Sequence, residues 1–104
     1  NLSSAKNLTA FFDFIYFSKY KDKFIKALPH GGSKKSTLEN RFEHYKDSII
    51  AKTGTLSGVS CLSGYINSPK YGPLAFSIII NGFVGSVEPY RKFQDDICSW
   101  LMQD

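Results

Sequence analysis

Three strand-length segments follow one another in the second half of the chain, with short connections between them. Residues 48–53, 59–66 and the stretch from Leu74 to Phe83 are rich in β-branched and aromatic residues, and Gly, Ser, Asn and Pro separate them. Antiparallel neighbours can be joined by such turns, whereas parallel neighbours need a crossover of roughly a dozen residues or more. The spacing therefore predicts a three-stranded antiparallel meander.

The segment before the strands has helical periodicity. Thr9 is a candidate N-cap for a helix that runs to about Lys19, and residues 24–28 form a further helical turn before Pro29. The first helix is apolar on two faces, so we expect it to need cover on two sides; a membrane-surface helix at residues 14–26 is the rival interpretation. The rest, up to the first strand, reads as polar loop with one helical turn near residues 38–42.

A last helix follows the strands. Ser86 is its expected N-cap and Pro89 lies in its first turn. The stripe expected to face the sheet consists of Tyr90, Phe93, Ile97, Trp100 and Leu101, and the opposite side carries Arg91, Lys92, Asp95 and Asp96. The predicted fold class is α+β, a small antiparallel sheet flanked by N-terminal and C-terminal helices.

Length and charge exclude several classes of protein. A chain of 104 residues is at most one domain, and no apolar run approaches the roughly 20 residues that span a bilayer. The net charge of +4 is mild and the lysines are scattered, so we expect no nucleic-acid partner. The chain begins at Asn1 without Met or a signal-like segment, so we interpret it as a processed or trimmed piece of a longer protein.

The cysteines and histidines do not predict a metal centre or a cofactor. His30 and His44 have no Cys or His partner at ligand spacing, so we expect no metal ion and no cofactor. Cys61 and Cys98 are far apart in apolar contexts, and buried free thiols are the expected state. A disulfide between them stays open as the alternative.

One polar stretch interrupts the first strand and carries the candidate chemistry. A lysine alone at position 52 would be an exposed edge residue. Thr53 and Thr55 add hydroxyl groups beside Lys52, and Gly54 lets another backbone approach closely. Together these residues predict an edge strand that pairs with an extended peptide and binds its terminal carboxylate.

The same stretch carries a resemblance to a known family. Lys52-Thr53-Gly54 matches the third signature of penicillin-binding proteins and serine β-lactamases. The longer sequence AKTGTLSGVSCLSGYI, followed by GPLAFSIIINGF, closely resembles penicillin-binding D-alanyl-D-alanine carboxypeptidase/endopeptidases that carry a large insertion in their catalytic domain. Upstream, LSSAKNLT resembles that family's LS-x-x-N-L segment and ALPHGG…STLENR its LP-x-x-G…G-[ST]-L-x-x-R segment, so the resemblance runs from Leu2 to about Phe83.

The resemblance implies a fold, a substrate and roles for four residues. Residues 1–104 would form a single partial domain, the C-terminal part of a transpeptidase-like catalytic domain. The substrate would be a peptidoglycan stem peptide ending in D-Ala-D-Ala, with β-lactams as analogues, in the periplasm or cell envelope. Lys52 would bind the terminal carboxylate and set the electrostatics of the catalytic hydroxyls. Thr53 and Thr55 would bind the same carboxylate, Gly54 would make room for the peptide, and the Thr55 N–H would form half of the oxyanion hole.

Two motifs of the family are missing. The strings Ser3-Ser4-Ala5-Lys6 and Ser18-Lys19-Tyr20-Lys21 satisfy S-x-x-K, but neither stands where the family has its nucleophile, and Cys61 stands where a smaller residue such as Ala is expected. No S-x-N occurs. We therefore expect the nucleophile to lie outside these residues and the chain alone to be inactive. A non-catalytic interaction module and a basic surface-binding domain are the alternatives.

The resemblance also predicts how the sheet assembles. In the family, the strand from Leu74 to Phe83 pairs with a strand from the N-terminal part of the protein, which these residues do not supply. Its outer edge would then be free and apolar, without Pro or Lys between Ala75 and Asn81. We expect self-association through the edge from Leu74 to Phe83, or pairing with the N-terminal part as a separate partner.

Overall fold

The strands form the meander that their spacing predicts. The structure, a computed structural model, describes residues 4–103. The strands are β1 (Ile49–Leu56), β2 (Val59–Ser68) and β3 (Gly72–Asn81), in the order β1-β2-β3 with both pairs antiparallel. The helices are α1 (Ala5–Tyr16), α2 (Lys21–Ala27), the 3-10 helix η1 (Lys46–Ser48) and α3 (Glu88–Leu101). The α+β class is confirmed.

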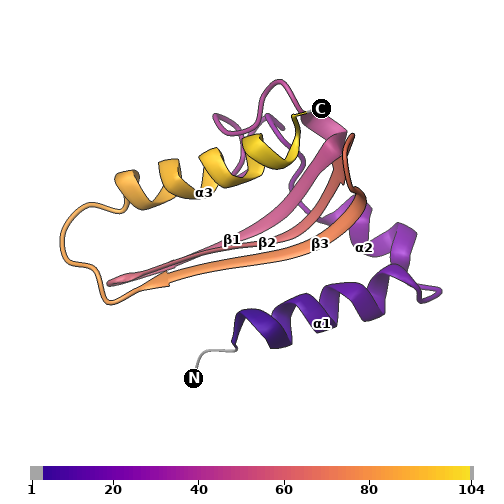
Figure 1. The fold of residues 1–104 in the computed structure, drawn as a ribbon, viewed down its shortest axis with the longest axis horizontal. Helices are drawn as coiled ribbons and strands as arrows, with labels where there is room; N and C mark the ends of the chain where they lie inside the picture. Colours follow the sequence, from indigo (N-terminus) through magenta and orange to yellow (C-terminus); the bar gives the residue numbers. More distant parts are fainter. Residues whose placement is uncertain (1–3, 104) are drawn as a thin grey trace.

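Helices cover both faces of the sheet. As Figure 1 shows, α3 lies along one face and α1 along the other, with α2 beyond the end of α1. α1 contacts β3 and β2, and α3 contacts β2. The molecule thus has three layers, and each face of the sheet has its own hydrophobic core.

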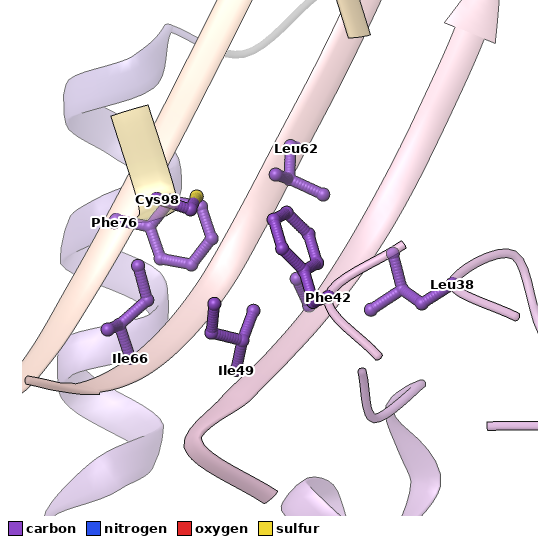
Figure 2. Close-up of a cluster of buried hydrophobic side chains, with 8 residues drawn as sticks. Leu38, Phe42, Ile49, Leu62, Ile66, Phe76 and Cys98 are labelled. Carbon is purple, nitrogen blue, oxygen red and sulfur yellow. The ribbon is translucent and has the colours of Figure 1, made fainter. Parts of the chain in front are cut away.

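The core under α3 joins all three strands to the loop that precedes them. Figure 2 shows Ile49 from β1, Phe76 from β3 and Cys98 from α3 among the side chains that pack together. Leu38 and Phe42 enter the same cluster from the loop and are buried. Residues 38–42 form turns and no helical turn, so that prediction is wrong. The loop is held by the burial of its two apolar side chains, not by helical periodicity.

The core on the α1 face is smaller and mostly aromatic. Phe12, Leu28, Ile50 and Tyr65 are buried there, and the rings of Phe12 and Tyr65 meet edge to face at 5.4 Å. The Tyr65 hydroxyl donates a hydrogen bond to the carbonyl oxygen of Phe12 at 2.6 Å. Burial, with smaller contributions from Asp13 and Tyr16, raises the pKa of Tyr65 to about 12, so this hydroxyl stays a donor at neutral pH.

Both long helices begin at residues other than the predicted ones. α1 begins at Ala5, because the Ser4 side chain accepts the Asn7 N–H at 3.1 Å and acts as the cap. Thr9 is therefore inside the helix. α3 has Val87 as its N-cap, and the predicted cap residue before it, Ser86, accepts the N–H of the first helical residue at 3.3 Å.

The buried stripe of α3 also differs from the predicted one. Gln94 and Cys98 are fully buried against the sheet, whereas Phe93 and Trp100 are about half exposed. The Gln94 side chain is accommodated because its Nε2 donates to the Ser60 hydroxyl at 3.3 Å. A buried amide with a partner replaces the aromatic contact that the periodicity predicts.

A glycine allows β1 and β2 to approach closely. Gly64 lies opposite Ala51 in the register of the two strands. A Cβ atom at Gly64 would meet the carbonyl oxygen of Ile50 and lie 2.7 Å from the Cα of Ala51. The close approach therefore requires glycine at this position. Its partner Ala51 directly precedes the polar stretch of β1.

Candidate functional site

The outer edge of β1 is covered only at its start. β2 pairs with β1 along its whole length on the inner side. On the outer side, Gly31 donates its N–H to Ile49 O and Ala51 donates its N–H to Pro29 O, both at 2.9 Å. Among residues 4–103, no backbone group pairs with this edge beyond Ala51. The uncovered part begins at Lys52.

The free backbone groups belong to the two threonines. Alternate residues of a strand direct their N–H and C=O groups to the same side. Since the backbone groups of Ile49 and Ala51 point to the outer edge, those of Thr53 and Thr55 do so as well. The Thr53 carbonyl and the Thr55 N–H are thus the acceptor and the donor that an extended peptide would meet at this edge.

Lys52 lies on the α1 face of β1 with an exposed side chain. It follows Ile50 by two residues, and Ile50 belongs to the core on that face. The Lys52 Nζ donates a hydrogen bond to the Thr53 carbonyl oxygen at 2.9 Å. The ammonium group therefore sits at the free edge and occupies the acceptor that an incoming N–H would use.

Thr53 and Thr55 project toward the α3 face, where an arginine reaches them. The Arg91 Nη2 of α3 donates to the Thr55 Oγ1 at 3.3 Å. The same guanidinium forms an ion pair with Glu88 one turn earlier, with Nη1 and Oε1 separated by 2.9 Å. The hydroxyl of Thr55 accepts from arginine and keeps its own hydrogen to donate.

These residues line one open groove. Its volume is about 490 Å³, and its lining residues are Thr37, Arg41, Lys52, Thr53, Gly54, Thr55 and Arg91. Three of the seven carry a positive charge and none carries a negative charge. The groove therefore favours an anionic ligand, and its hydroxyls and free backbone groups favour a peptide carboxylate.

The carboxylates that pair with the two arginines lie outside the groove lining. Arg41 donates to Asp95 from Nε at 2.9 Å and from Nη2 at 2.6 Å. Arg91 pairs with Glu88. Within residues 4–103, Lys52 has no carboxylate within ion-pair distance, so its charge is available to a ligand.

Gly54 is not required by the packing of the sheet. Its backbone φ is not in the left-handed region, and a Cβ atom there would lie 3.6 Å from the Cβ of Cys61, an ordinary contact. The absence of a side chain therefore serves no contact in the described part of the chain. It leaves the strand open to an approaching backbone on the face that carries Lys52.

A row of polar side chains crosses the sheet next to Lys52. Lys52 pairs in register with Ser63 of β2, and Ser63 pairs with Ser77 of β3. The hydroxyls of both serines are buried, and neither has a hydrogen-bond partner among the described residues. Buried hydroxyls are normally satisfied, so both serines retain the capacity for a further hydrogen bond.

The cysteines do not take part in the groove. Both are free, as expected, and no disulfide joins them. Cys98 is fully buried, and burial, followed by the charge of Asp95, raises the pKa of its thiol to about 12. Cys61 is only partly buried, against the expectation, because its register partner in β1 is Gly54, which has no side chain to cover it.

No cluster of metal-ligating side chains occurs in residues 4–103. Among the helices of the same residues, none has the length and apolar character needed to cross a membrane.

The structure brings Lys52, Thr53, Gly54 and Thr55 to one edge and adds two residues that the sequence did not single out. Arg41 lies in the quoted STLENR segment, but no role is assigned to it from sequence. Arg91 was predicted on the solvent side of its helix. The sequence around Arg91 gives no indication that its side chain contacts Thr55, which lies 36 residues earlier in the chain.

The S-x-x-K string that begins at Ser18 shows no catalytic arrangement. The Ser18 hydroxyl donates to Ile15 O at 2.8 Å and accepts the Tyr20 N–H at 3.1 Å, which is a local turn at the end of α1. Ser3 lies outside the described residues. Tyr65-Ile66-Asn67, the string most like S-x-N, follows the Lys-Thr-Gly stretch and lies within β2.

The fold is that of penicillin-binding proteins. Two solved structures of penicillin-binding protein 4 (dacB) from Haemophilus influenzae superpose on the whole chain with TM-scores of 0.78 and 0.80 at 25% identity. The chain covers 26% and 25% of those proteins, and the first is complexed with a novel β-lactam. The transpeptidase-like fold predicted from the resemblance is therefore shown.

The chain belongs to the D-Ala-D-Ala carboxypeptidase 3 (S13) family, a family of peptidases, whose model matches residues 1–103. It is also similar to the D-alanyl-D-alanine carboxypeptidase of Actinomadura sp. (strain R39), with 66% identity over 37 residues. That match covers 36% of this chain and 7% of the Actinomadura protein. The chain thus spans about a quarter of the solved relatives and a small part of the curated one.

Proposed function

We propose that this chain is the C-terminal part of a serine D-Ala-D-Ala carboxypeptidase/endopeptidase that acts on peptidoglycan stem peptides. Residues 1–104 are one part of a transpeptidase-like catalytic domain, and the complete protein works in the periplasm or cell envelope. The observation that carries the proposal is the uncovered edge of β1. There the Lys52 ammonium, the Thr53 carbonyl and the Thr55 N–H face outward beside a cationic groove.

The substrate binds as an additional strand on this edge. A peptide N–H replaces the Lys52 ammonium as the donor to the Thr53 carbonyl. The ammonium is then free to interact with the carboxylate and the catalytic hydroxyls. The terminal carboxylate accepts from Lys52 and from the hydroxyls of Thr53 and Thr55. Gly54 allows the peptide backbone to lie against the strand without a side chain in the way.

The reaction is acyl transfer to a serine outside these residues. The serine oxygen attacks the carbonyl carbon of the penultimate D-Ala, and the carbonyl oxygen becomes an oxyanion that accepts the Thr55 N–H. The C–N bond breaks, the leaving D-Ala amine takes up the proton of the serine hydroxyl, and water then hydrolyses the ester. A β-lactam forms the same ester but keeps its leaving group attached.

The unsatisfied hydroxyls support the proposal that the domain is partial. Ser63 and Ser77 stand beside Lys52 on the face where a nucleophile and its neighbours would lie. A polar segment over that row would satisfy both hydroxyls and enclose the Lys52 ammonium. Enclosure in turn would strengthen the electrostatic effect of the ammonium on a bound anion.

Labelling by penicillin tests the proposal directly. The complete protein should gain the mass of one penicillin, whereas the chain of residues 1–104 alone should gain none. Removal of the nucleophile typically costs about 10⁶ in kcat. A mass increase of the isolated chain that is lost on Ser18→Ala would show that the nucleophile lies within these residues.

The alternative is an interaction module that keeps the fold and binds a peptide at the same edge without cleaving it. In that case the complete protein would bind a D-Ala-D-Ala peptide but would gain no mass with penicillin. The distinction needs only the mass measurement and a binding isotherm for the same preparation.

A further inference from the structure

The groove contains a cation that the proposed peptide-binding residues leave unused. Arg91 is contributed by α3, an element outside the Lys-Thr-Gly-Thr stretch, and it reaches across to the Thr55 hydroxyl at 3.3 Å. Its side chain is about one third exposed, so it is held in place but still accessible to a ligand. The Lys-Thr-Gly-Thr motif itself contains no arginine.

Arg91 is held at its guanidinium and at its backbone. Glu88 pairs with the guanidinium Nη1 at 2.9 Å. Arg41 donates from Nη2 to the backbone carbonyl of Arg91 at 3.4 Å, while its shorter bonds go to Asp95. The start of α3 is thus tied to the loop that lines the groove, and the arginine does not have to be ordered when a ligand binds.

The contact with Thr55 also orients a donor. A threonine hydroxyl has one hydrogen to donate and two lone pairs to accept. Since one lone pair accepts from Arg91, the hydroxyl hydrogen is directed away from the guanidinium, and the positive charge makes it a better donor. The remaining N–H groups of Arg91 and the hydroxyl of Thr55 then form a pair of donors, which is the arrangement that a carboxylate accepts.

We infer that Arg91 is a specificity-determining residue that binds the terminal carboxylate of the substrate together with Thr55. This inference rests on the proposed function and names which group of the substrate the arginine recognises. Arg91 therefore selects peptides with a free C-terminal carboxylate over those in which it is masked. Arg41 is a positioning residue that acts through the backbone of Arg91.

Kinetics of the complete protein on two substrates tests the inference. One is a D-Ala-D-Ala peptide with a free carboxylate and the other is its C-terminal amide. Arg91→Ala should lower kcat/KM for the free peptide roughly tenfold and leave that for the amide unchanged, because a hydrogen bond to a charged group is lost only with the first. Lys92→Ala, which removes a neighbouring charge that pairs with Asp96 at 3.2 Å, should change neither.

Acylation by penicillin and by its methyl ester gives a second measurement of the same preference. Arg91→Ala should reduce the preference for the free acid by a similar factor, and Arg91→Lys, which keeps the charge, should restore part of it. Equal losses on both members of either pair would mean that Arg91 only holds α3 in place, and that result would overturn the inference. If the wild-type protein processes none of the four compounds, the proposed function fails before the inference is reached.

Discussion

The two outer edges of the sheet differ in what they can bind. The edge of β1 carries Lys52 and two threonines, and its groove is lined by arginines. The edge of β3 carries Ile78, Ile79 and Ile80 in succession, and no strand pairs with it among the described residues. The first edge offers charged and hydroxyl groups to a polar ligand, whereas the second offers unpaired backbone groups among apolar side chains.

We propose that the β3 edge pairs with another chain segment. In the complete protein this is the N-terminal part of the same chain, and in the isolated chain it is a second copy. Phe14 of α1 and Phe17, its C-cap residue, are 70% and 80% exposed, which agrees with the same absence of cover. Each prediction below changes one edge or the core between them.

The largest effect is expected at the β1 edge. Lys52→Ala in the complete protein should lower the rate of acylation by labelled penicillin at least about 100-fold, because it removes the preorganised charge that is proposed to bind the carboxylate and act on the catalytic hydroxyls. The thermal unfolding midpoint should change little, since the Lys52 side chain is exposed and makes only the hydrogen bond to Thr53.

Lys26→Ala is the matched control for that prediction. Lys26 is an exposed lysine at the end of α2 and does not line the groove. Its variant should be acylated at the wild-type rate. Unchanged labelling of Lys52→Ala would sink the assignment of this edge as the substrate site.

The fold could be predicted further from the sequence than the site could. The alternation of strand and turn signals predicts three antiparallel strands, because the connections at residues 56–59 and 68–72 are too short to join parallel neighbours. The start of α1 was not predicted correctly, because a single side chain decides where a helix is capped. Ser4, and not Thr9, accepts the free N–H at the start of α1. The stripe of α3 was misjudged because the partner of Gln94, Ser60, lies on another element.

The residues of the site were predictable only where they lie together in the sequence. Lys52, Thr53, Gly54 and Thr55 form one contiguous motif, so their common edge follows from a single strand. Arg91 joins them only through tertiary structure, and periodicity assigned it to the solvent side. A side chain as long as arginine reaches around the flank of its helix, which a projection of Cβ positions does not anticipate.

Two glycines sharpen the comparison of sheet and edge. Gly64 is required for the close packing of β1 and β2, whereas Gly54 lies at the open edge and is not required by the packing. Gly64→Ala should cost about 2 kcal/mol in the free energy of unfolding, because the new Cβ meets the backbone of β1. Gly54→Ala should change it by less than about 0.5 kcal/mol, yet it should reduce acylation in the complete protein.

Urea unfolding of both glycine variants, with penicillin labelling of the complete protein, makes this measurement. If Gly54→Ala proves as destabilising as Gly64→Ala, the glycine of the motif is structural. The openness of the β1 edge would then lose one of its supports.

The β3 edge should respond to charge through association. Ile79→Lys should weaken self-association of the isolated chain at least about tenfold, because a lysine on an edge strand opposes pairing with a second strand. Val84→Lys adds the same charge in the exposed loop after β3 and should leave association unchanged. Sedimentation at about 100 μM separates the two variants, and a monomeric wild-type chain with protected amides at Ile78 to Ile80 would count against this edge as a docking surface.

The smallest effect concerns the core that joins the two edges. Cys98 of α3 packs with Ala51 of β1 and Phe76 of β3, so it becomes exposed when α3 separates from the sheet. Its pKa is raised from 9.0 to about 12 by burial, so the unfolded thiol loses its proton first as the pH rises. Stability from this group is complete below about pH 8, and between there and pH 9.5 the free energy of unfolding should fall by roughly 1 kcal/mol. Cys98→Ala should abolish that part of the pH dependence and Cys61→Ala should keep it. Urea unfolding followed by Trp100 fluorescence and by circular dichroism measures both, and a slope that persists without Cys98 would mean that another group, not this buried thiol, produces it.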